Sequence, residues 1–376
     1  MKHKAKIIAA ALAAGMTVTL TGCGGCMGCN GCGGTTVIDT ISRSNWFTAT
    51  SYNGIQPTFI EGHDKFSPEI ITYGVTYDDT FASNEHIALE YKDGNYTTEF
   101  YATEYDWSSS PESYSDGKTK TEVVYVFKSK LNISVKYKMK KSGEESDWFK
   151  DSVETVSYFR AAGKNLSPVY SRQVMVSTSP AGYQPATLED AYREVNVTYE
   201  NFYSYDCEKV LAYTTENGKT ESKEHSLTKL NAALFDNSSL YIAVRSMKLS
   251  STLSQSITLF STAAGGADTY AVAGVESPLT DTERATFTEK LKAEGLYEST
   301  AKEDEEDKGV QSTAVTVSYA GGNLRGSSQT IWYAAITDSD RNVSRTTMLK
   351  LSIPISFGLG TLNYSLKEIQ STLWNG

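Results

Sequence analysis

The chain has 376 residues, and its 45 aspartates and glutamates outnumber its 35 lysines and arginines, giving a formal net charge of −10 at pH 7. A nucleic-acid-binding protein carries a basic footprint, so this balance argues against that class. The length suits one large β domain or two of ordinary size, and the 24 tyrosines, together with many threonines, valines and serines, favour strands.

The first residues have the plan of an export signal. The basic start MKHKAK precedes residues 7–20, which are uncharged, mostly apolar and rich in alanine. A membrane-spanning helix needs about 20 apolar residues, and this run is shorter. We therefore expect residues 1–22 to be a signal peptide.

The signal ends in Leu20-Thr21-Gly22-Cys23, which resembles the lipobox of bacterial lipoproteins. By this resemblance, Cys23 carries a diacylglyceryl group and is the first residue of the mature chain. Two acyl chains bind a membrane stably, whereas one binds only marginally. The resemblance, which covers the first two dozen residues, therefore implies lipid anchoring on the extracytoplasmic face of the cell membrane. A secreted protein cleaved at another site is the alternative.

Four cysteines, from Cys23 to Cys32, lie three residues apart. This spacing is close to the ferredoxin cluster motif C-x2-C-x2-C-x3-C-P, but the last gap is one residue short and no proline follows. A zinc site would need one ligand from elsewhere in the chain. Lipidation would also turn Cys23 into a thioether, so we predict neither a metal nor a cofactor.

For the other cysteines, disulfide formation is favoured over a metal site, because exported proteins meet an oxidising environment in many bacteria. A plain tether, in which these thiols have no assigned role, is the simpler interpretation. The four candidate cysteines are Cys26, Cys29, Cys32 and Cys207. Four cysteines allow three sets of disulfide pairings. The many glycines around the first three make this stretch a flexible coil. We therefore interpret residues 23–36 as a lipidated tether between the membrane and a folded domain.

The strongest strand pattern covers residues 131–140. Polar side chains alternate there with apolar ones, which is typical of a sheet with one buried and one solvated face. The apolar set is Leu131, Ile133, Val135, Tyr137 and Met139. Just before it, residues 122–127 read EVVYVF and predict a more fully buried strand, joined to the first by a hairpin through residues 128–130.

Two dipeptides predict tight hairpin turns, because they supply the positive φ angles that such turns require. Asp93-Gly94 lies between IALEY and YTTEFYA, and Asn217-Gly218 lies between VLAYTTE and KTESK. Further strands are predicted at residues 70–76, 153–160, 169–177, 239–247, 256–261, 269–275, 314–319, 330–337, 347–355 and 360–366.

Helices are few. Residues 280–295 give the best prediction, because Thr280 and Glu283 form a capping box and Gly295 can end the helix. A short second helix is predicted over residues 186–195. No alternation of strands with helices is visible, which argues against a parallel α/β sheet.

The segment STSPAGYQP, residues 177–185, bears proline and glycine and is the predicted domain boundary. We therefore expect a mainly β protein made of antiparallel sandwich-like domains with one or two short helices. A β domain would cover residues 37–180, and a second would cover residues 181–376 with a helix near 281–295.

No catalytic motif is present in the sequence. It has no G-x-S-x-G nucleophile elbow and no S-x-x-K followed by S-D-N and K-T-G. A glycosidase needs only two carboxylates placed by the fold, and spacing in the sequence identifies no such pair. We therefore nominate no catalytic residue.

Aromatic residues in polar, serine-rich surroundings are the better functional signal. The stretch YATEYDWSSSPESYSDG carries the candidate ligand-binding aromatics Tyr101, Tyr105, Trp107 and Tyr114. Such rings stack on sugars or anchor a protein interface; the alternative is that they fill a core. Lysines 136, 138 and 140, with 128, 130 and 141 nearby, would suit an anionic wall polymer, or form a solvated face that prevents edge pairing.

These features predict a non-catalytic binding or structural module, anchored in the membrane of the bacterial envelope. The expected partner is cell-wall glycan or another envelope protein, and nucleic acid is not expected. The alternative function is a surface hydrolase that acts on polysaccharide or peptide.

Overall fold

The computed structural model describes residues 48–49, 69–115, 121–162, 165–227, 234–247, 249–299, 306–319, 328–338 and 343–371. Its strands are β1 (Thr48–Ala49), β2 (Glu69–Asp78), β3 (Ile87–Asp106), β4 (Thr121–Met139), β5 (Phe149–Ala162), β6 (Asn165–Pro180), β7 (Tyr192–Tyr203), β8 (Lys209–Glu216), β9 (Lys219–Ser226), β10 (Leu234–Asp236), β11 (Ser254–Ser261), β12 (Gly266–Val275), β13 (Thr313–Tyr319), β14 (Gln329–Asp338), β15 (Val343–Pro354) and β16 (Thr361–Ser371). Its α-helices are α1 (Glu112–Ser115), α2 (Leu240–Arg245) and α3 (Asp281–Ala293).

All sixteen strands belong to one sheet, in the order β10-β11-β12-β13-β14-β15-β16-β2-β3-β4-β5-β6-β7-β8-β9, with β1 paired to β15. Each pair of neighbours is antiparallel except β10 and β11, which are parallel. The predicted mainly β, antiparallel fold is therefore confirmed.

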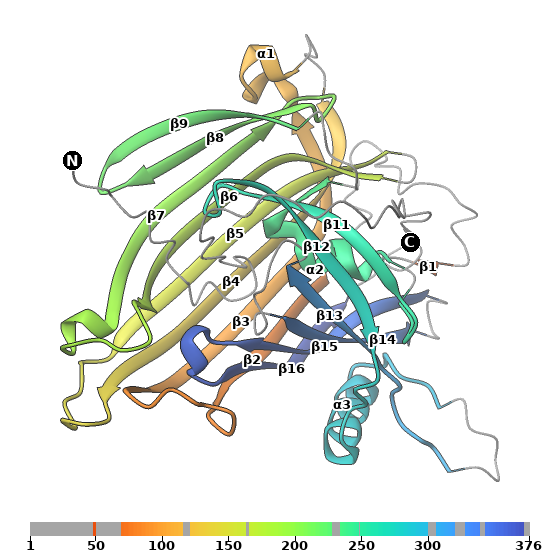
Figure 1. Cartoon of the computed structure of the whole chain (residues 1–376). Coiled ribbons are helices and arrows are strands. Elements are labelled where there is room, and N and C mark those ends of the chain that lie inside the picture. The colour runs from red at the N-terminus through yellow and green to blue at the C-terminus, as the bar shows by residue number, and fades with distance from the viewer. Residues whose placement is uncertain are drawn as a thin grey trace, which may run out of the picture.

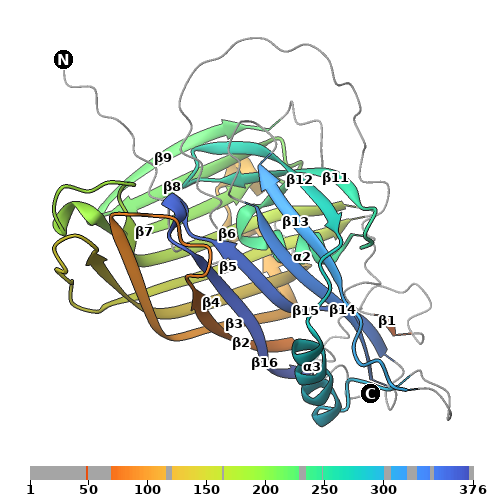
Figure 2. The ribbon, with the colours of Figure 1, turned by 60° about the horizontal axis from the view of Figure 1, so that its bottom comes forward.

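The sheet curls strongly on itself, and α2 lies on its concave side (Figure 1). The curl brings the short strand β10 back against β6, where Ser171 donates a hydrogen bond to Asp236 at 2.6 Å. Beyond this contact, Tyr203 of β7 and Val210 of β8 pack against Phe260 of β11. In Figure 2, β8, β9, β11 and β12 all lie in the upper part of the view. The concave face therefore becomes the core, and the convex face of β3–β6 remains the outer face.

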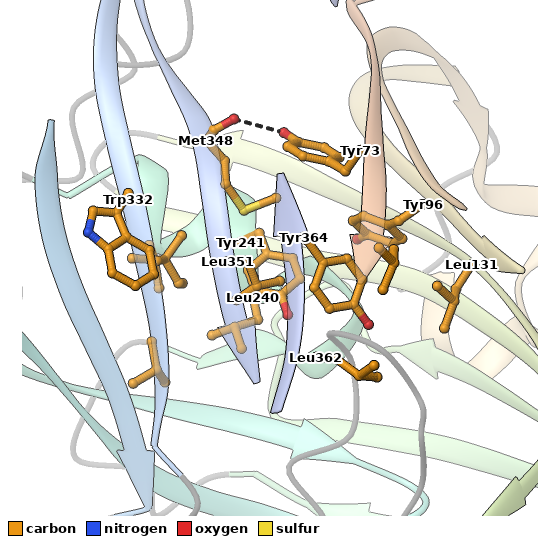
Figure 3. Packing of buried hydrophobic residues seen from close by; sticks show 14 of the residues in the cluster. Tyr73, Tyr96, Leu131, Leu240, Tyr241, Trp332, Met348, Leu351, Leu362 and Tyr364 are labelled. Atoms are coloured by element: carbon orange, nitrogen blue, oxygen red, sulfur yellow. Dashed lines mark hydrogen bonds between the residues drawn. The ribbon is translucent and has the colours of Figure 1, made fainter. Parts of the chain in front are cut away.

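The core is filled by aromatic side chains. Tyr73, Tyr96 and Tyr364 are almost completely buried, and their ring centroids lie 5.8 Å (Tyr73–Tyr96) and 5.4 Å (Tyr96–Tyr364) apart (Figure 3). The Tyr73 hydroxyl donates to the carbonyl oxygen of Met348 at 3.0 Å. Tyrosine is therefore abundant because it fills a wide interior with large apolar rings, and some of its hydroxyls find partners there.

The alternating strand predicted at residues 131–140 is confirmed, with all five of its apolar side chains buried. The predicted hairpin through residues 128–130 is wrong, because β4 runs unbroken from Thr121 to Met139. The inward positions Phe127, Ser129 and Leu131 continue one period-2 pattern, and lysines occupy the outward positions between them. No glycine, asparagine or proline interrupts this stretch to favour a turn.

The two predicted glycine turns have different outcomes. Asn217-Gly218 does connect β8 to β9, and both residues have positive φ (52° and 74°). Asp93 also has a positive φ of 56°, but it forms a bulge within the continuous strand β3, where the register with β4 shifts between Lys92 and Asn95. A Cβ on Gly94 would lie 2.5 Å from the carbonyl oxygen of Val75, so the neighbouring strand also requires a glycine there.

The strand predicted at residues 239–247 is wrong, because this apolar segment forms α2. Every residue of α2 is buried. A short apolar run does not distinguish a strand from a buried helix, and at the centre of a curled sheet a helix satisfies its own backbone hydrogen bonds. The guanidinium of Arg245 pairs with the Glu69 carboxylate through two contacts, of 2.6 and 3.0 Å, which tie α2 to β2.

The helix predicted at residues 280–295 is confirmed as α3. Its Thr280–Glu283 capping box is present, and the φ of Gly295 is 67°. Glu283 forms an ion pair with Lys350 of β15 at 2.5 Å, which links α3 to the sheet. The second predicted helix is reduced to the 3-10 turn η4 (Glu189–Ala191), because β7 begins at Tyr192.

The sheet and the core both run through the predicted boundary at residues 177–185. Ser177–Pro180 are the last residues of β6 and pair with β7, and β16 pairs with β2. The main core includes residues from both predicted domains, such as Ile71 and Leu362. One curled sheet therefore stands where the sequence predicted two sandwich-like domains.

Candidate functional site

Three of the four candidate aromatics are buried. Tyr105, Trp107 and Tyr114 are only 8%, 1% and 2% exposed. The indole of Trp107 donates to Glu122 at 3.1 Å, and its ring lies 5.1 Å from that of Tyr205. Tyr105 and Trp107 pack with Val124 and Val169 in a small core on the outer face of the sheet, whereas the Tyr114 hydroxyl donates to Glu224 at 2.5 Å. These three rings therefore present little surface to solvent, and ligand binding by them stays a prediction.

Tyr101 has a different environment. Its ring is half-buried on β3, and the ammonium of Lys128 lies 5.0 Å from its centroid. A cation over an aromatic ring is attracted by the negative face of the ring. Tyr101 is therefore the candidate aromatic that lies beside a charged surface.

The predicted basic face of lysines is largely neutralised at one end. Lys136 and Lys138 both contact the carboxylate of Glu145, at 2.5 and 2.6 Å, and these lysines hold the pKa of Glu145 at about 2. Lys140 donates to the carbonyl oxygen of Asn84 at 2.8 Å. These three lysines are therefore already engaged within the fold.

The other end of the lysine series lines a groove of about 410 Å³ on the outer face of β3–β6. Its lining residues are Thr97, Glu99, Lys128, Ser129, Lys130, Glu154, Thr155, Val156 and Arg172. We call this surface the outer groove. Its volume lies within the usual range of ligand sites, about 300–1,000 Å³.

Strand register places three charged side chains of the outer groove, those of Glu99, Lys128 and Arg172, in one row that crosses the strands, which we call the charged row. The row contains Glu99, Lys128, Val156, Arg172 and Glu200, one from each strand from β3 to β7. Directly opposed side chains of neighbouring strands lie about 5 Å apart. Residues that are up to a hundred positions apart in the sequence therefore form one continuous surface.

A second row, two residues away along each strand, flanks the charged row, and we call it the aromatic row. It contains the aromatic side chains of Tyr101, Tyr158, Tyr170 and Phe202, together with the buried Val126 of β4. The centroids of Tyr158 and Tyr170 are 5.7 Å apart, and those of Tyr170 and Phe202 are 5.0 Å apart. All four rings are half-buried, so each presents part of its surface to solvent.

The charges in the outer groove and in the charged row are unequally paired. Lys130 and Glu154 form an ion pair at 2.5 Å, and Glu200 accepts a hydrogen bond from Tyr170 at 2.5 Å. Within the described ranges, neither Lys128 nor Arg172 has a carboxylate at ion-pair distance. A hydrogen bond with Tyr101 raises the pKa of Lys128, which keeps this ammonium charged. The outer groove therefore offers two cations to an anionic ligand.

A second polar cluster lies where β10 meets β6 and β7. The buried carboxylate of Asp236 accepts hydrogen bonds from Ser171 at 2.6 Å, from Tyr203 at 2.5 Å and from the backbone N–H of Ser238 at 2.7 Å. Asn201 also donates to Ser171 at 2.9 Å. Because these partners satisfy the carboxylate, we interpret the cluster as the closure of the curled sheet.

The cysteine predictions fall mostly outside the described residues. The structure does not describe Cys23, Cys26, Cys29 or Cys32, so lipidation and disulfide pairing stay predictions. Cys207 is described, is half-buried and is present as a thiol that donates to the carbonyl oxygen of Pro168 at 3.6 Å. Burial raises the pKa of this thiol, which makes it less nucleophilic.

Sequence reasoning did not select Glu99, Glu154, Tyr158, Tyr170 or Arg172 as site residues. Their alternation along β3, β5 and β6 indicates which residues share a face of their own strand. It does not reveal the cross-strand register that makes them neighbours. Lys128 and Lys130 were predicted as part of the lysine series, and the structure separates them from lysines 136, 138 and 140.

In the part of the chain that the structure covers, no group of three or more histidine, cysteine, aspartate or glutamate side chains is arranged to hold a metal ion. No helix in those same ranges is long and apolar enough to cross a membrane.

No family model matches the chain, and no curated protein matches it in sequence. One solved structure to which the chain is similar is a β-barrel-like protein of a domain of unknown function from Brucella abortus. The two chains are 9% identical with a TM-score of 0.39, and the match covers 81% of this chain and 98% of the other.

Proposed function

We propose that the protein is a membrane-anchored bacterial envelope lipoprotein whose β domain binds an envelope partner through the outer groove, without catalysis. The observation that carries the binding role is the pair of cations, Lys128 and Arg172, set beside an aromatic row on one open face. The concave side is filled by α2 and buried tyrosines, which favours a ligand on the outer face.

The anchoring role rests on the apolar segment at residues 7–20 and on the Leu20-Thr21-Gly22-Cys23 motif. For the full chain expressed in a bacterium, we expect the tryptic peptide Cys23–Arg43 from the membrane fraction to carry a diacylglyceryl mass on Cys23. The Cys23→Ser variant should lack this mass, whereas Cys207→Ser should retain it. An unlipidated wild-type peptide, or a mature N-terminus elsewhere, would contradict the anchoring role.

The binding role predicts that the full-length protein co-sediments with the insoluble cell-envelope fraction of its native bacterium. The double variant Lys128→Gln/Arg172→Gln should lose at least tenfold in affinity, because charge-assisted contacts to the partner are removed. Lys138→Gln is the matched control, since it removes a lysine that Glu145 already engages. Equal sedimentation of the double variant and the wild type would refute a role for the outer groove.

A second candidate function is hydrolysis of polysaccharide, which the presence of Glu99 and Glu154 in the same groove favours. Glu154 already forms an ion pair with Lys130 at 2.5 Å, so a substrate would have to compete with Lys130 for this carboxylate. Release of new reducing ends by the wild type, with loss of activity in Glu99→Gln and Glu154→Gln, would favour the enzyme over the binding module.

A further inference from the structure

We propose that the ligand of the outer groove is a linear polysaccharide that bears carboxylate groups, lying across strands β3–β7. This inference rests on the function proposed above and specifies its partner. It follows from the order of the rows on the outer face, from their charge and from the position of the aromatic rings.

The direction of the ligand follows from the strand register. The charged row and the aromatic row each cross five neighbouring strands, so both run perpendicular to the strands. A ligand that contacts both rows along their length must be extended and must also cross the strands. A polymer satisfies this requirement, whereas a compact small molecule would contact only one or two positions of each row.

The anionic character follows from the charges that remain unpaired. Lys128 and Arg172 lie in one row, separated by the short side chain of Val156. Glu200, at the end of the row, is occupied by the Tyr170 hydroxyl. A guanidinium and an ammonium at such positions bind carboxylates through charge-assisted hydrogen bonds. A neutral polymer would leave both cations without a function.

The acidic residues near the cations indicate that the negative charges of the ligand are widely spaced. Glu99 and Glu200 lie in the charged row with the cations, and Glu154 lies beside that row, opposite Lys130. The whole chain has a net charge of −10. A densely charged polyphosphate or nucleic acid would be repelled by these carboxylates. A polymer with one carboxylate on each sugar or on every few sugars can place its charges on the cations alone.

The sugar character follows from the aromatic row. Tyr101, Tyr158, Tyr170 and Phe202 form a partly exposed ridge along one flank of the cations. Aromatic rings combine a large apolar surface with specific geometry, and the apolar faces of sugar rings stack on such surfaces. Thr97 on the opposite flank offers a hydroxyl for hydrogen bonds with the sugar.

The test uses the purified full-length protein and three soluble polymers: polygalacturonate, its methyl-esterified form and poly-glutamate. We expect polygalacturonate to bind and the other two to bind at least tenfold more weakly, because each lacks either the charge or the sugar. Lys128→Gln/Arg172→Gln should weaken polygalacturonate binding at least tenfold, and Lys138→Gln should leave it unchanged. Tyr158→Leu, which keeps apolar bulk but removes the ring, should weaken it several-fold.

Three outcomes would overturn the inference. Equal binding of poly-glutamate would show attraction to charge alone, and equal binding of the esterified polymer would show that the cations take no part. Absence of polygalacturonate binding, while the double variant still loses binding to the native envelope fraction, would overturn the ligand class and leave the proposed function intact. If the wild type binds neither the polymers nor the envelope fraction, both proposals fail.

Discussion

Replacing Arg245 with alanine is expected to lower the free energy of unfolding by about 3–5 kcal/mol, the usual effect of breaking a buried ion pair. The side chains of Arg245 and Glu69 are only 4% and 3% exposed, and their two contacts are 2.6 and 3.0 Å long. Removal of the guanidinium takes away both of these contacts to the buried Glu69 carboxylate. Urea denaturation, with the slope of the transition checked against wild type, measures the change.

The double variant Glu69→Met/Arg245→Met separates the ion pair from the packing that surrounds it. Replacing both charges by apolar side chains of similar volume is often neutral or stabilising, so this variant should be more stable than Arg245→Ala. Lys130→Ala breaks a half-exposed pair and should cost less than about 1 kcal/mol. If Arg245→Ala lowers the free energy of unfolding no more than Lys130→Ala does, the Arg245–Glu69 pair does not stabilise the contact between α2 and β2.

The stability of the protein is expected to fall between pH 5 and pH 8 because of Asp151. This carboxyl is 3% exposed, and burial raises its pKa from 3.8 to about 7 despite hydrogen bonds from Thr178. The folded state therefore retains a proton that the unfolded chain has lost. The resulting stability is fully present below about pH 4 and is lost as the pH rises through about 7. Between pH 5 and pH 8 the loss from this group is about 2–3 kcal/mol.

The Asp151→Asn variant should remove this pH dependence, because its amide carries no charge and its oxygen still accepts hydrogen bonds from Thr178. Relative to wild type, the variant should therefore gain stability as the pH rises from 5 to 8. Asp106→Asn is the control, since hydrogen bonds from Ser108 lower the pKa of that exposed carboxyl, far from this pH range. Parallel pH profiles for Asp151→Asn and wild type in urea denaturation would contradict the assignment.

The features that were predicted correctly depend on interactions of shorter range than those that were predicted wrongly. The capping box of α3 and the Asn217-Gly218 turn depend on residues within four positions of one another, and both were predicted correctly. Asp93-Gly94 has the same local preference, yet the approach of Val75 makes it a bulge within β3. The local preference of Asp93-Gly94 therefore predicted the positive φ angle correctly, but it did not distinguish a hairpin turn from a bulge within a strand.

The residues of the candidate site were also difficult to predict from the neighbouring sequence. The aromatic stretch at residues 101–114 was predicted as a binding surface because its surroundings in the sequence are polar. The chain folds back so that Trp107 and Tyr114 are buried, and only Tyr101 stays beside the outer groove. Arg172 and Glu99 become neighbours of Lys128 through three strand pairings, which no single-strand pattern contains.

The fold class, the inward face of β4 and the position of α3 follow from the sequence, because strand alternation and helix capping are encoded within a few residues. The three-dimensional arrangement was needed to show that there is one curled sheet, that residues 240–245 form a helix inside it, and that the outer groove exists. Each of these depends on register and closure between distant strands. That information resides in the packing of the whole chain, since a shift of one residue would turn every side chain of a strand to the other face.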